Sequence, residues 1–118
     1  MIRIIGNRGE GTGLLTNLAI EKLLETQPNC LCLLIDYTSE FSPLVDKLNG
    51  ITIPVSEYHK EYTEHLLSRL DEGNFFRFLL DIHSGYLEYV LAEIEKLASK
   101  IEKMYSRKVF LIYKTVND

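Results

Sequence analysis

The sequence lacks an apolar segment of the length that crosses a lipid bilayer, which takes about 18 consecutive apolar residues. Its first residues also lack a basic stretch followed by an apolar one, the pattern of a secretory signal. Positive charge is scarce, since 13 lysines and arginines stand against 17 aspartates and glutamates, for a net charge of −4. This balance gives no support to broad nucleic-acid binding. We therefore expect a cytoplasmic protein with no membrane and no nucleic-acid partner.

Cysteine is also rare, and Cys30 and Cys32 do not have the spacing of a metal or redox motif. Zinc knuckles and redox-active pairs separate their cysteines by two residues, whereas one residue separates these. Residues i and i+2 of a strand lie on the same face of a sheet. The spacing therefore predicts two reduced thiols buried on one face of a strand.

The 118 residues, 46% of them hydrophobic and 25% charged, have the composition of a soluble globular protein with one domain over residues 1–118. Buried apolar segments alternate with segments of helical periodicity. Strands are predicted over residues 2–5, 30–35, 75–80 and 108–114, with a proline-containing edge strand or loosely attached strand at 51–55. Helices are predicted from about 12 or 13 to 26, and over 43–48, 56–70 and 86–105. The alternation predicts an α/β three-layer sandwich with a mostly parallel sheet.

Two of the predicted helices have an apolar stripe that should face the sheet. The stripe of the first consists of Leu14, Leu15, Leu18, Ala19, Leu23 and Leu24. In the longest helix the stripe begins at Leu87 and ends at Met104. These stripes predict helices that pack against the sheet.

A glycine-rich segment joins the first predicted strand to the first helix. It reads Gly6-Asn7-Arg8-Gly9-Glu10-Gly11-Thr12-Gly13. A strand, a glycine-rich turn and a helix form the context of a phosphate-binding loop, because glycines let the backbone surround an anion and the helix start presents free N–H groups. Against the pattern G-x-x-x-x-G-K-[ST], Gly6 and Gly11 are in register. The lysine position holds Thr12 and the hydroxyl position holds Gly13, so the backbone part of the motif is present without its two reactive side chains.

The missing lysine has a calculable consequence for binding. A charge-assisted hydrogen bond contributes roughly 1.5–3 kcal/mol, so its loss weakens nucleotide binding ~10- to 150-fold. Phosphoryl transfer depends on lysine and metal to neutralise developing charge, and it should suffer more than binding does. Arg8 lies inside the segment as a partial replacement, although a planar guanidinium substitutes poorly for a compact ammonium. The alternative is a glycine-rich turn that binds nothing.

Two carboxylates follow buried strands, at Asp36 and Asp81. Ligands of doubly wound sheets bind at the carboxyl ends of the strands, where these carboxylates should lie. They are candidate magnesium ligands beside the glycine segment, and the alternative is a structural pair that caps loops or helix starts. His83 and Ser84 follow Asp81, but no G-x-S-x-G segment accompanies them. We therefore assign no catalytic residue.

With these segments placed, the chain resembles the N-terminal half of a ParA/MinD-type partitioning ATPase, a P-loop NTPase. The resemblance lies in residues 7–14, 34–38 and 78–83, which correspond to that family's phosphate loop, second-strand aspartate motif and Walker B segment. It implies a P-loop-NTPase-like, truncated fold and ATP with magnesium as the cofactor. The chain departs from the family at both lysine positions, which hold Asn7 and Thr12, and at Gly13 and Thr38. RecA-like ATPases share the strand–loop–helix opening and an apolar Walker B strand.

These features favour a non-catalytic regulatory or assembly module with a degenerate Walker A loop that binds nucleotide or phosphate weakly. The enzyme alternative is a weak Mg-dependent ATPase of the ParA/MinD or RecA-like type, which would bind MgATP through the loop amides, Arg8, Asp36 and Asp81. A third alternative is a structural protein that uses the same edge to bind another protein. We expect protein partners in either non-catalytic case.

Self-association is predicted from the last strand. If the chain is half of a larger sheet, the apolar segment Val109–Tyr113 has an exposed edge, which a second copy would cover. The sequence therefore predicts a homodimer or a larger homo-oligomer. The competing interpretation places this strand inside the sheet and Ile51–Val55 at the edge, and it needs no dimer.

Overall fold

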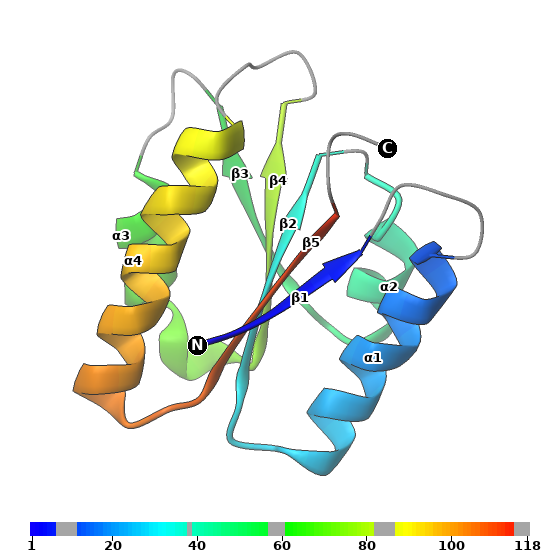
Figure 1. Cartoon of the computed structure of the whole chain (residues 1–118), viewed down its shortest axis with the longest axis horizontal. Helices are drawn as coiled ribbons and strands as arrows, with labels where there is room; N and C mark the ends of the chain where they lie inside the picture. The colour runs from blue at the N-terminus through cyan, green and yellow to red at the C-terminus, as the bar shows by residue number, and fades with distance from the viewer. Residues whose placement is uncertain (7–11, 38, 57–60, 82–86, 115–118) are drawn as a thin grey trace.

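The computed structural model of the chain describes residues 1–6, 12–37, 39–56, 61–81 and 87–114, with the backbone alone at residues 12–15 (Figure 1). Five parallel strands form one sheet in the order β1-β5-β2-β4-β3. The strands are β1 (Ile2–Gly6), β2 (Leu31–Asp36), β3 (Ile51–Val55), β4 (Phe75–Leu80) and β5 (Val109–Lys114). The prediction of an α/β fold with a parallel sheet is confirmed.

Helices cover both faces of the sheet (Figure 1). The helical elements are α1 (Thr12–Thr26), α2 (Ser42–Lys47), α3 (Tyr62–Ser68), the 3₁₀ helix η1 (Leu70–Glu72) and α4 (Leu87–Tyr105). Side chains of α1 and α2 pack on one face, and side chains of α3 and α4 pack on the other. The crossovers through α1 and α2 run along the sheet from β1 towards β3, and those through α3 and α4 run back. All four crossovers therefore share one hand, which is right-handed in Figure 1.

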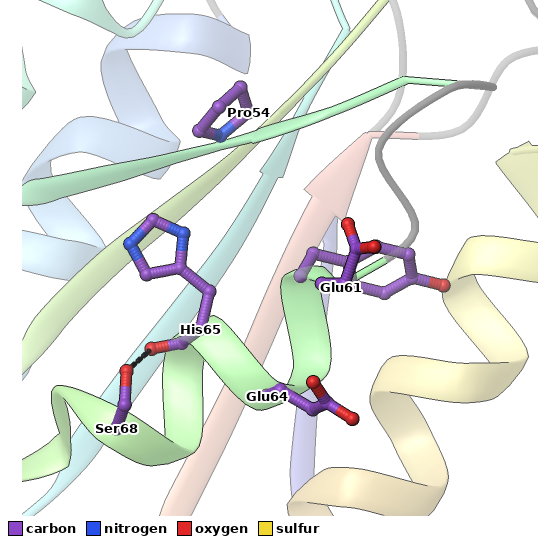
Figure 2. A pocket seen from close by; sticks show the side chains of 6 residues that line it. Pro54, Glu61, Glu64, His65 and Ser68 are labelled. Atoms are coloured by element: carbon purple, nitrogen blue, oxygen red, sulfur yellow. Dashed lines mark hydrogen bonds between the residues drawn. The ribbon is translucent and has the colours of Figure 1, made fainter.

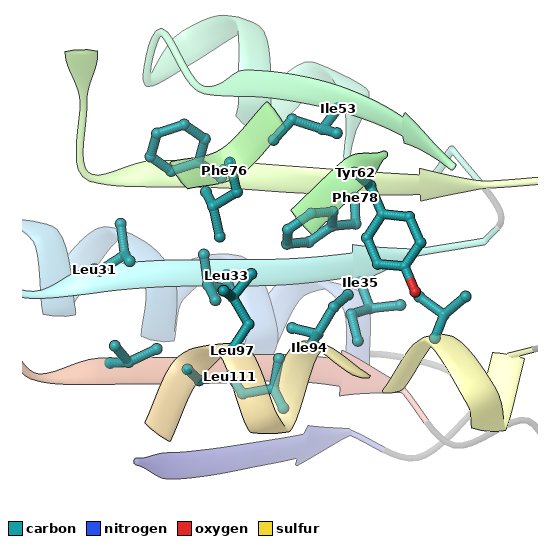
Figure 3. Packing of buried hydrophobic residues seen from close by; sticks show 14 of the residues in the cluster. Leu31, Leu33, Ile35, Ile53, Tyr62, Phe76, Phe78, Ile94, Leu97 and Leu111 are labelled. Atoms are coloured by element: carbon teal, nitrogen blue, oxygen red, sulfur yellow. The ribbon is translucent and has the colours of Figure 1, made fainter. Parts of the chain in front are cut away.

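The larger core lies between the sheet and the α3/α4 layer (Figure 3). Alternate residues of the strands point into it, as the period of two in a strand requires. Phe78 of β4 meets Tyr62 of α3 edge to face, with ring centroids 6.0 Å apart and planes at 78°. From α4, the predicted stripe supplies Val90, Ile94 and Ile101, all buried. Met104, at the end of that stripe, is 63% exposed, so the prediction that it packs against the sheet was wrong.

On the other face, α1 is rotated relative to the predicted stripe. Leu18 is 53% exposed, whereas Ile20 is fully buried and Thr16 is 6% exposed. Thr16, Ile20, Leu23 and Leu24 follow the spacing i, i+4, i+7 and i+8 of one helical face. The predicted stripe is confirmed at Leu23 and Leu24 and wrong at Leu18, because aliphatic residues occur on several sides of this helix and their positions do not define one stripe. The side chains of Leu14 and Leu15 lie outside the described residues.

Cys30 and Cys32 lie where the sequence predicts them. Both are buried on the α1/α2 face of the sheet as free thiols, with their sulfur atoms 3.9 Å apart. Burial, followed by the neighbouring Cys30, raises the pKa of the Cys32 thiol. This thiol therefore stays protonated at neutral pH and has little nucleophilic reactivity.

The predicted position of β5 at an exposed edge was wrong. β5 lies between β1 and β2, and its residues Val109 to Ile112 are at most 4% exposed. A continuous apolar run is typical of a strand covered on both faces. The edges are β3, as the competing interpretation predicts from Pro54, and β1, where Ile2 and Ile5 are 41% and 51% exposed. The original reason for a dimer is therefore removed, and the oligomeric state stays a prediction.

Two other element predictions need correction. Ser56, predicted to begin a helix, instead forms a β-bridge after β3. The described part of the predicted 56–70 helix begins at Tyr62 and ends at Ser68, and η1 follows. None of the described helices has the length and apolar character needed to cross a membrane.

Glu102 of α4 connects the beginning of β1 to the beginning of β5. Its carboxylate contacts the N-terminal ammonium of Met1 and accepts a hydrogen bond of 3.2 Å from the Val109 N–H. Hydrogen bonding from the N-terminal ammonium is the main cause that lowers the pKa of Glu102 from its ordinary value of 4.5. Because the pKa of Glu102 is lower in the folded state, its ionised carboxylate stabilises the fold at pH values above the ordinary pKa. This contribution is lost as the pH falls through the lowered pKa.

Glu102→Gln should therefore lower the melting temperature at pH 7, and the difference from the parent protein should shrink as the pH falls below 4.5. Thermal unfolding followed by circular dichroism at a series of pH values checks this. A difference that stays constant down to the acid limit would show that the charge of Glu102 contributes nothing.

Candidate functional site at the carboxyl edge of the sheet

The predicted site residues belong to the edge of the sheet where the parallel strands end, called here the carboxyl edge. Gly6 is the last residue of β1, and Thr12 and Gly13 are the first two residues of α1. Asn7, Arg8, Gly9, Glu10 and Gly11 lie outside the described residues. The strand and the helix on either side of the glycine segment are thus in place, and its role in anion binding stays a prediction.

The strand order places the two predicted metal ligands at different distances from this segment. Asp36 ends β2, which one strand separates from β1, and Asp81 follows β4, one strand further away. With about 4.8 Å between neighbouring strands, β2 lies about 10 Å from β1 and β4 about 14 Å. Asp36 is therefore the carboxylate closer to the glycine segment.

Asp36 is 1% exposed and forms a buried ion pair with Arg77 of β4. Its Oδ2 lies 3.3 Å from Nη1 of Arg77, and its Oδ1 accepts a hydrogen bond of 3.0 Å from the Ser39 N–H. Asp36 thus compensates a buried cation and organises the turn that leads into α2. This geometry favours the structural alternative for Asp36.

Arg77, on β4, is in contact with three other elements. Besides Asp36, it donates to Ser42 Oγ at 2.7 Å and, through Nε and Nη2, to Thr52 Oγ1 at 3.2 and 3.0 Å. These contacts join β4 to β2, to β3 and to the first residue of α2. Sequence reasoning missed Arg77, although an arginine inside the apolar run Phe75–Leu80 was a signal, because a buried arginine needs a partner.

Asp81 is exposed and differs from Asp36 in its environment. Among the described residues, no group of three or more histidine, cysteine, aspartate or glutamate side chains could hold a metal ion. The assignment of Asp36 and Asp81 as metal ligands stays a prediction. Both oxygens of Asp36 already have a described partner, and a metal bound there would place a divalent cation beside the Arg77 guanidinium.

Lys114, the last residue of β5, places a second buried cation at this edge. It is 7% exposed, its Nζ lies 2.9 Å from Oε2 of Glu40, and the same nitrogen lies 5.5 Å from the centre of the Phe41 ring. In the β1–β5 ladder, Lys114 is the partner of Gly6. A Cβ at Gly6 would lie 3.4 Å from Lys114 Cγ and 3.3 Å from Thr16 Oγ1, so the lysine stem packs close to the start of the glycine segment.

A groove with a volume of about 570 Å³ lies beside β3, the edge strand at the other end of the strand order from β1 (Figure 2). Its lining includes Pro54 of β3 and, on or next to α3, Glu61, Glu64 and His65. Ser68 also lines the groove, and its hydroxyl donates a hydrogen bond of 2.8 Å to the backbone oxygen of His65. None of the predicted site residues is among the described residues that line the groove.

Comparison with known proteins gives no relative from which a role could be transferred. No protein-family model matches the sequence, and no curated protein and no solved structure gives a significant match. The class of the protein is therefore the one that its fold defines, an α/β domain with a parallel sheet that is compatible with a P-loop-like fold.

Proposed function

We propose that this protein is a degenerate P-loop-NTPase-like domain that acts as a non-catalytic regulatory or assembly module and binds phosphate or nucleotide weakly. The observation that carries the proposal is the Asp36–Arg77 ion pair, in which the carboxylate closer to the glycine segment is buried and charge-compensated. The ParA/MinD resemblance and the position of the glycine segment between β1 and α1 support the phosphate-binding part.

The energetics oppose a magnesium-dependent reaction. Removing one member of a buried ion pair costs about 3–5 kcal/mol, because the other charge is left without compensation. A metal bound by Asp36 would compete with Arg77 for the charge of the carboxylate and repel the guanidinium, so its binding would incur part of this cost. The segment also lacks the lysine and the hydroxyl residue that would offset it, since Thr12 and Gly13 occupy those positions.

Isothermal titration with ATP, GTP and ADP, each with magnesium and with a chelator, tests the proposal. We expect weak binding whose Kd is the same in both conditions, and no release of phosphate from ATP over hours. Submicromolar binding that requires magnesium would overturn the proposal in favour of the ATPase alternative. The absence of binding with every nucleotide would also overturn it, and would favour a domain that binds only another protein.

Gly11→Val should abolish this binding, because a branched side chain would fill the space that the backbone offers to an anion. Gly73→Ala is the matched control at the other edge of the sheet. A Cβ at Gly73 would make an ordinary contact of 3.4 Å with Ile51, so this change should leave both folding and binding intact. Equal affinities of the two variants would contradict binding through the glycine segment.

A further inference from the structure

We propose that Lys114 supplies the ammonium group that the glycine segment lacks, so that a phosphate group at the carboxyl edge is bound by a lysine from β5. This inference rests on the proposed phosphate binding and adds the side chain that provides the positive charge. In the motif itself the lysine belongs to the loop, at the position that Thr12 occupies here.

The position of Lys114 is set by the sheet. It is the ladder partner of Gly6, the residue at which the glycine segment begins. Ile112 and Phe110, two and four residues earlier on β5, pack into the core under α1 and α2, so Lys114 points to the same face. Its stem lies against Gly6, which has no Cβ, and near Thr16 of α1. The ammonium is therefore on the side of the sheet where α1 begins.

Lys114 is buried, which lysine almost never is without a partner, and its partner is the carboxylate of Glu40. The other lysine that brackets β5, Lys108 at its amino end, is exposed and lies over an aromatic ring at the same distance of 5.5 Å. Contact with a ring therefore does not require burial on this strand. What distinguishes Lys114 is its place at the carboxyl edge and its contact with a carboxylate.

Glu40 occupies the place that we assign to a ligand anion. Its Oε2 lies 2.9 Å from the Lys114 Nζ, while its side chain is 37% exposed, against 8% for the lysine. The carboxylate is thus the outer member of the pair and can be solvated more readily than the ammonium. A phosphate group carries more negative charge than a carboxylate and offers more acceptor oxygens, so it should compete with Glu40 for the ammonium.

Titration of the full chain with pyrophosphate in the presence of a chelator tests this assignment. Lys114→Met should bind pyrophosphate ~10- to 150-fold more weakly than the parent protein, the range expected for loss of one charge-assisted hydrogen bond. Lys108→Met, the matched control on the same strand, should bind like the parent protein. Glu40→Gln should bind more tightly, because it removes the competing carboxylate and leaves Lys114 in place.

A second measurement uses the unaltered chain, in case Lys114→Met does not fold. Pyrophosphate should shift the NMR signals of the Lys114 side chain and leave those of the Lys108 side chain unchanged. Parent-like binding by a folded Lys114→Met variant, or unshifted Lys114 signals in the pyrophosphate complex, would overturn the inference while the proposed function stands. If the parent protein bound neither pyrophosphate nor nucleotide, the proposed function would fail, and this inference with it.

Discussion

Arg77→Met should lower the free energy of unfolding by about 3–5 kcal/mol, the range measured when one member of a buried ion pair is removed. The methionine would leave the Asp36 carboxylate, which is 1% exposed, without its guanidinium. It would also remove the donor to Ser42 Oγ and the two donors to Thr52 Oγ1. Chemical denaturation in urea, followed by circular dichroism, measures the loss.

Two further variants separate charge burial from packing. Adding Asp36→Asn to Arg77→Met removes the uncompensated charge, so the double variant should recover a large part of the loss. Arg3→Met is the surface control, because Arg3 pairs with Glu95 at 2.9 Å while its side chain is 50% exposed. That control should cost less than about 1 kcal/mol. A double variant as unstable as Arg77→Met alone would show that the guanidinium acts through its hydroxyl contacts and not through Asp36.

The sequence predicts the fold well where one signal dominates. The apolar segments that became β2, β4 and β5 are continuous apart from Arg77 in β4, and their parallel pairing follows from the alternation with helices. The order of the strands is a tertiary property that local patterns do not contain. An apolar run also looks the same whether a strand has two neighbours or one, and for this reason β1 looks like a buried strand in the sequence and β5 could be placed at an edge.

The candidate site was predictable only in part, for a related physical reason. Sequence spacing correctly places Gly6 and Asp36 at strand ends, because a change from apolar to polar residues marks where a buried strand stops. It cannot show that Arg77 reaches Asp36, since 41 residues separate them in the chain. The same holds for Lys114 and Glu40, which are 74 residues apart. Charged residues inside or at the end of apolar strands are nevertheless a usable signal, because their burial requires partners.

The Arg77 pair and the Lys114 pair also have different relations to function. Arg77 is 8% exposed and joins β2, β3, β4 and α2, so it contributes mainly to the position of the segment before α2. That segment carries Glu40 and Phe41, both in contact with Lys114. The buried pair at Asp36 therefore supports the geometry around the ammonium that we assign to phosphate binding, without contacting the ligand.

At the opposite edge of the sheet, Arg107→Met should lower the free energy of unfolding by about 2–3 kcal/mol, the cost of leaving partly buried carbonyl groups without a donor. Arg107 precedes β5 and connects three loops. Its guanidinium donates to the backbone oxygens of Leu70 and Gly73 at 3.0 and 3.2 Å, and to Asn74 Oδ1 at 3.1 Å. Longer contacts of 3.3 and 3.5 Å reach the backbone oxygens of Asn29 and Cys30.

Arg107→Lys tests whether the planar fork matters, because a lysine ammonium has three donors and cannot span the acceptors on two other loops. We expect it to recover less than half of the loss. Arg69→Met is the matched surface control, since Arg69 contacts only exposed Glu72 among the charged partners described, and it should change stability by at most about 0.5 kcal/mol. Urea denaturation of the three variants gives the comparison. If Arg107→Met were as stable as Arg69→Met, water would be satisfying these carbonyl groups, and the arginine would not be what holds the three loops together.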